Sequence, residues 1–163
     1  MLRITKLTDY AIVVLAQLAQ APSADEAVST ARDLARRTSI PGPTVSKILK
    51  ELAHARLVVS QRGLLGGYRL ARTASDISIA DVVRAVEGPI ALTDCNREEP
   101  EACGYAGACP VEANWIKINE AIFSALAAIS LAQMTRPITP QLIHLGLKRR
   151  EPALPDAAST PQE

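Results

Sequence analysis

One stretch of the chain combines a tight turn with the start of an amphipathic helix: Thr38-Ser39-Ile40-Pro41-Gly42-Pro43-Thr44-Val45-Ser46-Lys47-Ile48-Leu49-Lys50. Two prolines and a glycine make the turn. Pro43 suits the first turn of a helix, where its missing N–H costs nothing. The helix is expected from about Thr44 to Ala55. Its apolar face is formed by Val45, Ile48, Leu49 and Leu52.

Two further helices are expected before this turn. Leu7 to Gln20 has apolar residues at helical spacing, with Thr8 as the expected N-cap and Asp9 in the first turn. The next helix begins near Ser29 or Thr30 and carries Arg32 on its outward side. Three helices with a tight turn between the second and third are typical of a helix-turn-helix.

A glycine-rich hairpin is expected after the third helix. The β-prone runs 57–60 and 68–70 flank Arg62-Gly63-Leu64-Leu65-Gly66-Gly67. A short helix follows from Ser78 to Val86, and Gly88-Pro89 ends it. This order predicts a mainly α protein whose residues 1–88 form a winged helix-turn-helix DNA-binding domain with a two-stranded wing.

Charge is distributed unevenly along the chain. Between Ser29 and Arg72 there are nine Lys or Arg and two acids, so this block favours a polyanion as partner. In a winged helix-turn-helix the third helix reads the major groove and the wing reaches the backbone or the minor groove. The alternative is two packed helices with a solvated basic face, but the basic hairpin favours double-stranded DNA. The expected DNA contacts are Arg32, Thr44, Ser46, Lys47, Lys50, Arg62, Gly66, Gly67 and Tyr68.

All three cysteines of the chain lie in the segment 89–111, as Cys95, Cys103 and Cys109. The chain shows neither a signal peptide nor a membrane-spanning run, so a soluble cytoplasmic protein with reduced thiols is expected. Three thiols are an odd number for disulfides. They indicate an incomplete metal site.

A long apolar-striped helix is expected from Glu112 to Met134, which has no internal Gly or Pro. Its apolar residues recur at alternating intervals of three and four, which is the spacing of a helix that pairs with the same helix of a second subunit. Residues 112–135 are therefore the expected dimerisation helix, although burial within the same subunit would give a similar stripe. The stripe consists of Trp115, Ile118, Ile122, Ala125, Ile129 and Ala132, with Leu126 beside it, and the residues expected to make the dimer contact are Trp115, Ile118, Ile122, Leu126 and Ile129. Residues 136–163 form an extension, with a short helix at 141–150 and disorder expected after Arg150.

Three pieces of the sequence together resemble the iron–sulfur winged-helix transcription regulators of the IscR and NsrR type. They are Leu2-Arg3-Ile4-Thr5-Lys6-Leu7-Thr8-Asp9-Tyr10-Ala11, the segment Leu57–Leu70, and the cysteine triplet. The resemblance covers roughly residues 1–135. It implies a bacterial homodimer whose cluster state alters its binding to an operator. The opening segment is most similar to the subgroup that regulates the SUF cluster-assembly operon.

The cysteine segment departs from that family in two ways. The family usually places five residues in both intervals between the cysteines, whereas this chain has seven and then five. Where the IscR-like branch has a His three residues after the last Cys, this chain has Glu112. The NsrR-like branch has an N-terminal Asp that matches Asp9. The resemblance thus implies Asp9 of the partner subunit as fourth ligand, and proximity makes Glu112 the second choice.

The thiol segment favours an iron–sulfur cluster over two alternatives. Small residues around Cys103 and Cys109 let backbone N–H groups approach cluster sulfides. A 2Fe–2S cluster is slightly favoured over 4Fe–4S. Structural zinc prefers closer cysteine pairs, and a bare thiol switch needs no metal. We therefore expect a cluster-dependent, sequence-specific regulator of SUF genes. The alternatives are a nitric-oxide- or redox-responsive repressor, a zinc or thiol-switch regulator and, least expected, a thiol redox enzyme.

Overall fold

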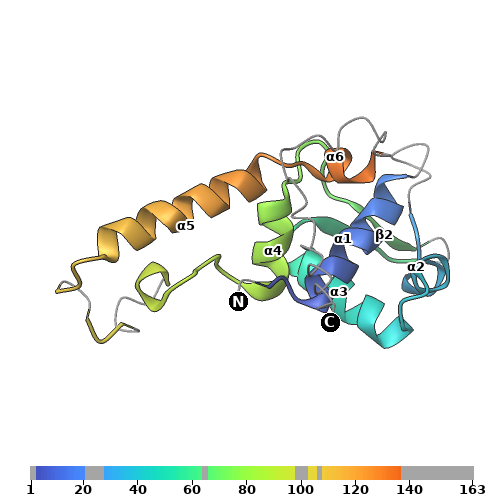
Figure 1. The fold of residues 1–163 in the computed structure, drawn as a ribbon. Coiled ribbons are helices and arrows are strands. Elements are labelled where there is room, and N and C mark those ends of the chain that lie inside the picture. Colours follow the sequence, from blue (N-terminus) through green and yellow to red (C-terminus); the bar gives the residue numbers. More distant parts are fainter. Residues whose placement is uncertain (1–2, 21–27, 64–65, 98–102, 106–107, 137–163) are drawn as a thin grey trace, which may run out of the picture.

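The computed structural model describes residues 3–20, 28–63, 66–97, 103–105 and 108–136. Figure 1 shows a helical body, from which α5 and the segment bearing the cysteines project to one side. The body also carries a two-stranded sheet. The elements are α1 (Lys6–Ala19), α2 (Ala31–Thr38), α3 (Gly42–His54), β1 (Val58–Gln61), β2 (Gly67–Leu70), α4 (Ile79–Glu87), the 3₁₀ helix η1 (Asp94–Asn96), α5 (Glu112–Ala127) and α6 (Leu131–Thr135).

Helix α1 lies at the centre of the body and contacts α2, α3, α4, α6 and β2. Its inner face is fully or almost fully buried at Ala11, Val14, Leu15 and Leu18. The expected N-cap was wrong by three residues. Thr5 is the N-cap, because its side chain accepts the Thr8 N–H, while Thr8 lies inside the first turn and is completely buried.

Helices α2 and α3 form the predicted helix-turn-helix. Helix α2 begins close to the expected position, and Thr30 caps it by accepting the Asp33 N–H. Ser39 then adopts the left-handed conformation with φ 58°, which ends the helix, and Ile40 is buried in the turn. The apolar face of α3 is completely buried. Its outward residues therefore face away from the core.

The predicted wing is present as an antiparallel pair. Val58 pairs with Leu70 and Gln61 with Gly67. A backbone bridge from Tyr68 to Ser29 adds a third short partner, with N···O distances of 2.9 and 3.0 Å. The wing is thereby fixed to the segment that leads into α2.

Helix α4 begins and ends where the sequence predicts. Ser78 and Asp81 form a reciprocal capping box, and Gly88 ends the helix with φ 87°. The positive φ is a conformation that glycine adopts without steric cost.

The expected single helix from Glu112 to Met134 is wrong, because the chain breaks after Ala127 and restarts at Leu131. Ser130 caps α6 by a second capping box with Gln133. Ile129 lies outside α5, so the stripe of the predicted dimerisation helix stops at Leu126. The predicted helix at 141–150 and the predicted disordered tail lie outside the described residues.

Helix α6 returns the chain to the body after α5. Leu131 is fully buried in the core, and the backbone beside it bonds to the segment before α4. Ile79 N–H donates to Ile129 C=O at 2.9 Å, and Leu131 N–H donates to Ile77 C=O at 2.8 Å. Residues 89–130 thus leave from the C-terminal end of α4 and return to its N-terminal end. We call residues 89–130 the arm.

We predict that Leu131→Ala lowers the free energy of unfolding by about 2–5 kcal/mol, because it leaves a cavity in the core. Met134→Ala, a few residues away on α6 and 51% exposed, is the matched control. It is expected to cost less than about 0.5 kcal/mol. Urea unfolding followed by circular dichroism measures both. Equal losses in the two variants would contradict the docking of α6 in the core.

Candidate DNA-binding surface and cysteine site

The outward side of α3 presents the residues expected to contact DNA. Ser46, Lys47 and Lys50 are exposed, and Thr44 is half-buried at the start of the helix. The first turn of α3 contains no acidic residue. Anions are therefore favoured at this end of the helix by both the side chains and the free backbone N–H groups.

Three arginines of α2 differ in their surroundings. Arg36 pairs with Asp33 at 3.2 Å, and Arg37 donates to the Ser29 hydroxyl. Arg32 is exposed and takes part in none of the ion pairs among the described residues. Of the three it is the one most available to a phosphate.

The wing glycines have a structural explanation within this chain. A Cβ on Gly66 would lie 2.5 Å from the Gln61 carbonyl oxygen, and a Cβ on Gly67 would lie 2.7 Å from that of Ser29. Close approach of backbone to backbone therefore requires both glycines. Their contact with DNA stays a prediction.

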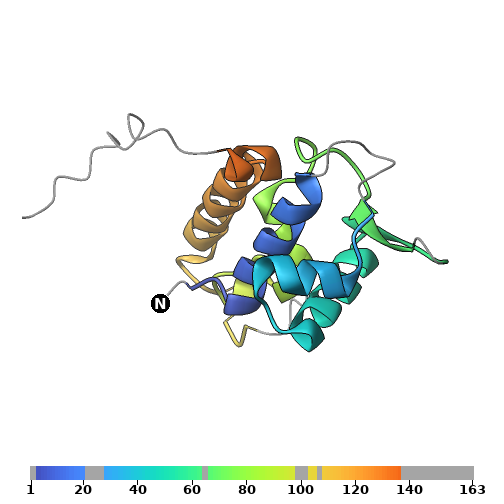
Figure 2. The ribbon, with the colours of Figure 1, turned by 90° about the vertical axis from the view of Figure 1, so that its right-hand side faces the viewer.

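Arg62 and Tyr68 occupy different environments on the wing. Arg62 is exposed just after β1, whereas the Tyr68 side chain is half-buried and packs against the core. Figure 2 shows the two strands extending beyond the helices. Arg62 is thus placed to meet a partner. Tyr68 has a clear role in holding the wing to the body, and its DNA contact stays a prediction.

The first cysteine is held close to α5. Cys95 lies in η1, half-buried, with its sulfur 3.0 Å from the Thr93 hydroxyl. Asn96 donates to the same hydroxyl at 2.7 Å and reaches the Trp115 carbonyl at 3.5 Å. Cys103 and Cys109 are also free thiols and half-buried.

The described part of the chain does not gather a complete metal site within one subunit. It contains no cluster of three His, Cys, Asp or Glu side chains close enough to hold a metal ion. Asp9 is exposed on α1 in the body, while the cysteine-bearing segment lies beside the outer half of α5 (Figure 1). Glu112, the second-choice ligand, is the half-buried first residue of α5.

A carboxylate that sequence reasoning missed joins the end of α4 to the start of α1. Glu87 accepts the Thr5 N–H at 3.0 Å and the Thr8 hydroxyl. Partial burial raises the pKa of Glu87, but hydrogen bonds from Thr8 and Thr5 outweigh it and leave the pKa below its ordinary value. The anion also lies at the positive end of α1. Glu87 thus fixes the point where the arm leaves the body.

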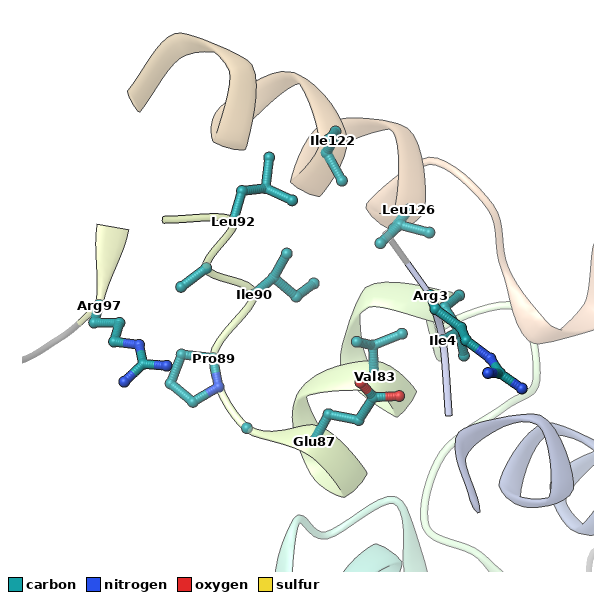
Figure 3. Close-up of a pocket in the computed structure, with 12 residues that line it drawn as sticks. Arg3, Ile4, Val83, Glu87, Pro89, Ile90, Leu92, Arg97, Ile122 and Leu126 are labelled. Atoms are coloured by element: carbon teal, nitrogen blue, oxygen red, sulfur yellow. The ribbon is translucent and has the colours of Figure 1, made fainter. Parts of the chain in front are cut away.

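A cavity of about 810 Å³ lies between the body and the arm. Figure 3 shows Ile122 and Leu126 of α5 facing Ile90 and Leu92, which lie on the segment after α4. Val83 of α4 lies below them. Arg3, Glu87 and Arg97 supply the charged part of the lining. Ile122 and Leu126, predicted for dimerisation, therefore also face their own subunit.

Asn119 and Asn96 were likewise missed, and both bind the segment around Cys95. Asn119 is a polar residue inside the apolar stripe of α5. That position was a signal the sequence did offer. Glu87 carried no such signal, because its partners Thr5 and Thr8 are distant in sequence. Asn96 binds Thr93 nearby, but its contact with the Trp115 carbonyl is also between residues far apart in the chain.

Comparison with known proteins places this geometry among DNA-binding transcription regulators. The HTH-type transcriptional repressor NsrR of Streptomyces coelicolor is 30% identical over 149 residues, which is 91% of this chain and 98% of that protein. Among solved structures, CymR, the global cysteine regulator of B. subtilis, has a TM-score of 0.63 at 25% identity, covering 83% of this chain and 97% of that one. The IscR of T. potens has a TM-score of 0.58 at 26% identity, covering 82% and 85%.

The model of the Rrf2 family, described as iron-dependent transcriptional regulators, matches residues 4–137. The chain belongs to the Rrf2 family. The winged-helix fold is confirmed by its structural neighbours, and its relatives are regulators and not enzymes, as predicted. In the part that the structure describes, no helix is both long and apolar enough to cross a membrane.

We predict that Glu87→Gln lowers the free energy of unfolding at neutral pH by about 0.5–1 kcal/mol. This loss is smaller than for a buried charged hydrogen bond, because water partly solvates the carboxylate. The folded-state pKa of Glu87 is depressed, so its stabilisation is present above the unfolded-state pKa. It is lost as the pH falls through the folded-state pKa. The difference between wild type and variant should therefore shrink in acid. Urea unfolding at several pH values measures it.

Glu120→Gln, at an exposed position of α5, is the control and should change stability little at any pH. A difference between wild type and Glu87→Gln that stays constant on acidification would contradict a charge-dependent bond from Glu87.

Proposed function

We propose that the protein is a homodimeric, iron–sulfur-dependent transcription regulator that binds a double-stranded operator in the cytoplasm. The observation that carries the proposal is the arm. It joins three cysteines to both ends of α4, and α4 packs against the DNA-reading helix α3. A change at the thiols therefore has a direct path to the DNA-binding surface.

The DNA contact is supported by unpaired positive charge on one domain. Lys47, Lys50 and Arg62 are exposed, and the ion pairs among the described residues involve none of them. Neutralised phosphates release counterions, so such side chains give affinity in proportion to their number. Side chains at the start of α3 supply sequence readout.

Dimerisation is supported by the exposure of α5. None of its residues is buried, and Trp115, Ile118 and Phe123 are 39%, 44% and 38% exposed. A helix of this length is marginally stable alone and needs tertiary packing of its apolar face. Its own subunit covers only one strip, around Asn119, Ile122 and Leu126. A second copy of α5 would cover the exposed apolar residues.

The donor set fits an iron–sulfur cluster. Cys95, Cys103 and Cys109 are free and half-buried thiols, the type of ligand that such clusters take. We propose Asp9 of the partner subunit as the fourth ligand. Because Asp9 and the cysteines lie in separate parts of one subunit, a dimer would be needed to join them. A bound cluster would cross-link the cysteine segment and so order the arm.

The SUF cluster-assembly genes are the proposed target, from the similarity of residues 2–11 to that subgroup. A nitric-oxide- or redox-responsive repressor is the second candidate. It is favoured by the match to the NsrR repressor over 91% of the chain and by Asp9.

We predict that Arg62→Ala weakens operator binding by about 1–3 kcal/mol and lowers its salt dependence, because the exposed guanidinium would be lost from the wing. Lys117→Ala removes the same charge from an exposed site on α5 and is the control. Fluorescence anisotropy at several salt concentrations compares them. If both variants bind alike, the wing does not contact the operator.

We predict that anaerobically purified protein is coloured and contains iron and sulfide. Cys103→Ser should abolish the colour. Asp9→Ala should speed its loss in air, since a carboxylate ligand is removed, whereas Glu112→Ala should not. Visible absorbance, with iron and sulfide analysis before and after nitric oxide, measures this. Stoichiometric zinc in a colourless protein would overturn the cluster. The opposite order of the two carboxylate variants would make Glu112 the ligand.

A further inference from the structure

The side chain of Asn119 binds the backbone of the arm at two points. Its Nδ2 donates to the Ile90 carbonyl at 2.9 Å, and its Oδ1 accepts the Leu92 N–H at 3.1 Å. One amide therefore satisfies an acceptor and a donor of the same extended segment, as a neighbouring strand would. Figure 3 shows that segment running beneath α5, with Ile90 and Leu92 on it.

The position of Asn119 on α5 argues against a chance contact. The strip of α5 that faces its own subunit also contains Ile122 and Leu126, which border a cavity and so pack incompletely. Apolar contacts of this kind do not define one alignment of helix and segment. A single polar residue in an apolar seam defines one alignment, because its hydrogen bonds form in only one register. Asn is also a weaker helix former than Ala, so helix propensity does not account for it.

The segment that Asn119 binds leads directly to Cys95. Thr93 follows Leu92, and its hydroxyl lies 3.0 Å from the Cys95 sulfur. Asn96 binds Thr93 and reaches the Trp115 carbonyl, one helical turn before Asn119. Helix α5 therefore holds the segment on both sides of Thr93, and the Cys95 sulfur lies within this set of bonds.

We propose that Asn119 is a positioning residue that fixes Cys95 against α5. By fixing Cys95, Asn119 would also help to retain a bound cluster, and this second role rests on the proposed function. The placement of the Cys95 thiol by Asn119 does not. Without the amide, residues 90–92 would lose their two bonds to α5. Cys95 would then sample more positions and meet solvent more often.

The first test uses the full-length, cluster-free protein. Asn119→Ala should raise hydrogen exchange of the Leu92 amide about tenfold, since a protecting bond is lost. In a Cys103→Ser/Cys109→Ser background it should also raise the rate at which a disulfide reagent labels Cys95 by about three- to tenfold. Asn114→Ala is the matched control: Asn114 lies on α5, is exposed, and has no side-chain hydrogen bond among the described residues. It should leave both rates unchanged.

Unchanged Leu92 exchange in Asn119→Ala would overturn the proposal, and so would faster exchange with unchanged labelling of Cys95. Asn119→Asp is the second variant, for use if the alanine protein does not fold. It keeps the acceptor for Leu92 but has no donor for Ile90. Leu92 protection should persist while Cys95 labelling still rises, and equal labelling to wild type would again overturn the proposal.

The second test measures the rate of cluster loss in air, which should rise about three- to tenfold in Asn119→Ala and not in Asn114→Ala. A cluster lost no faster in Asn119→Ala than in wild type would reject the role in retention. If wild-type protein holds no cluster, the proposed function fails, and the exchange and labelling rates of the cluster-free protein still decide the role of Asn119.

Discussion

The burial of α1 is the constraint on which the rest of the structure depends. Its inner face packs against α3 of the helix-turn-helix, against α4 and against α6. Since α6 directly follows the arm, the same core that holds the helix-turn-helix also holds the returning chain. Leu131 is as fully buried as Leu15. The arm is therefore a long loop whose two ends are both held by the body, one at each end of α4.

Because both ends of the arm are held at α4, a displacement of this weakly packed segment can move elements of the well-packed body. The interior is dense, so it transmits small displacements of whole elements more readily than it absorbs them. Glu87 binds the start of α1 at one end of α4, and the bonds of Ile77 and Ile79 hold the arm at the other. Helix α4 contacts α3 directly. Shifts of the arm would reach α3 through this one helix.

Much of the body was predictable, because its signals are local. The Pro41-Gly42-Pro43 turn, the cap at Ser78 and the glycines of the wing each act within a few residues. The failures have long-range causes. Thr5 and Thr8 are both reasonable caps, and a bond to Glu87, 79 residues from Thr8, decides between them. The apolar stripe of α5 continues into Ile129, yet docking of Leu131 breaks the helix. The Ser130–Gln133 capping box was a local sign of that break.

The site was predictable in composition and less so in arrangement. Basic residues on α3 follow from the period of its buried face. The environment of Cys95 does not. The place of Asn119 in the apolar stripe marks it as unusual, but its partners Ile90 and Leu92 lie in another part of the chain and follow from no spacing rule. The proposed fourth ligand would come from a second chain, and no local pattern of a single sequence indicates such a pairing.

The closed arm also bears on the length of the cysteine segment. This chain has seven residues between its first two cysteines and five between the second and third. Both ends of the arm are anchored on α4, so a longer interval between cysteines leaves these anchors unchanged. Closing a loop lengthened from five to seven residues costs only about 0.3 kcal/mol of chain entropy. The spacing of the thiols can therefore change without redesign of the winged helix-turn-helix.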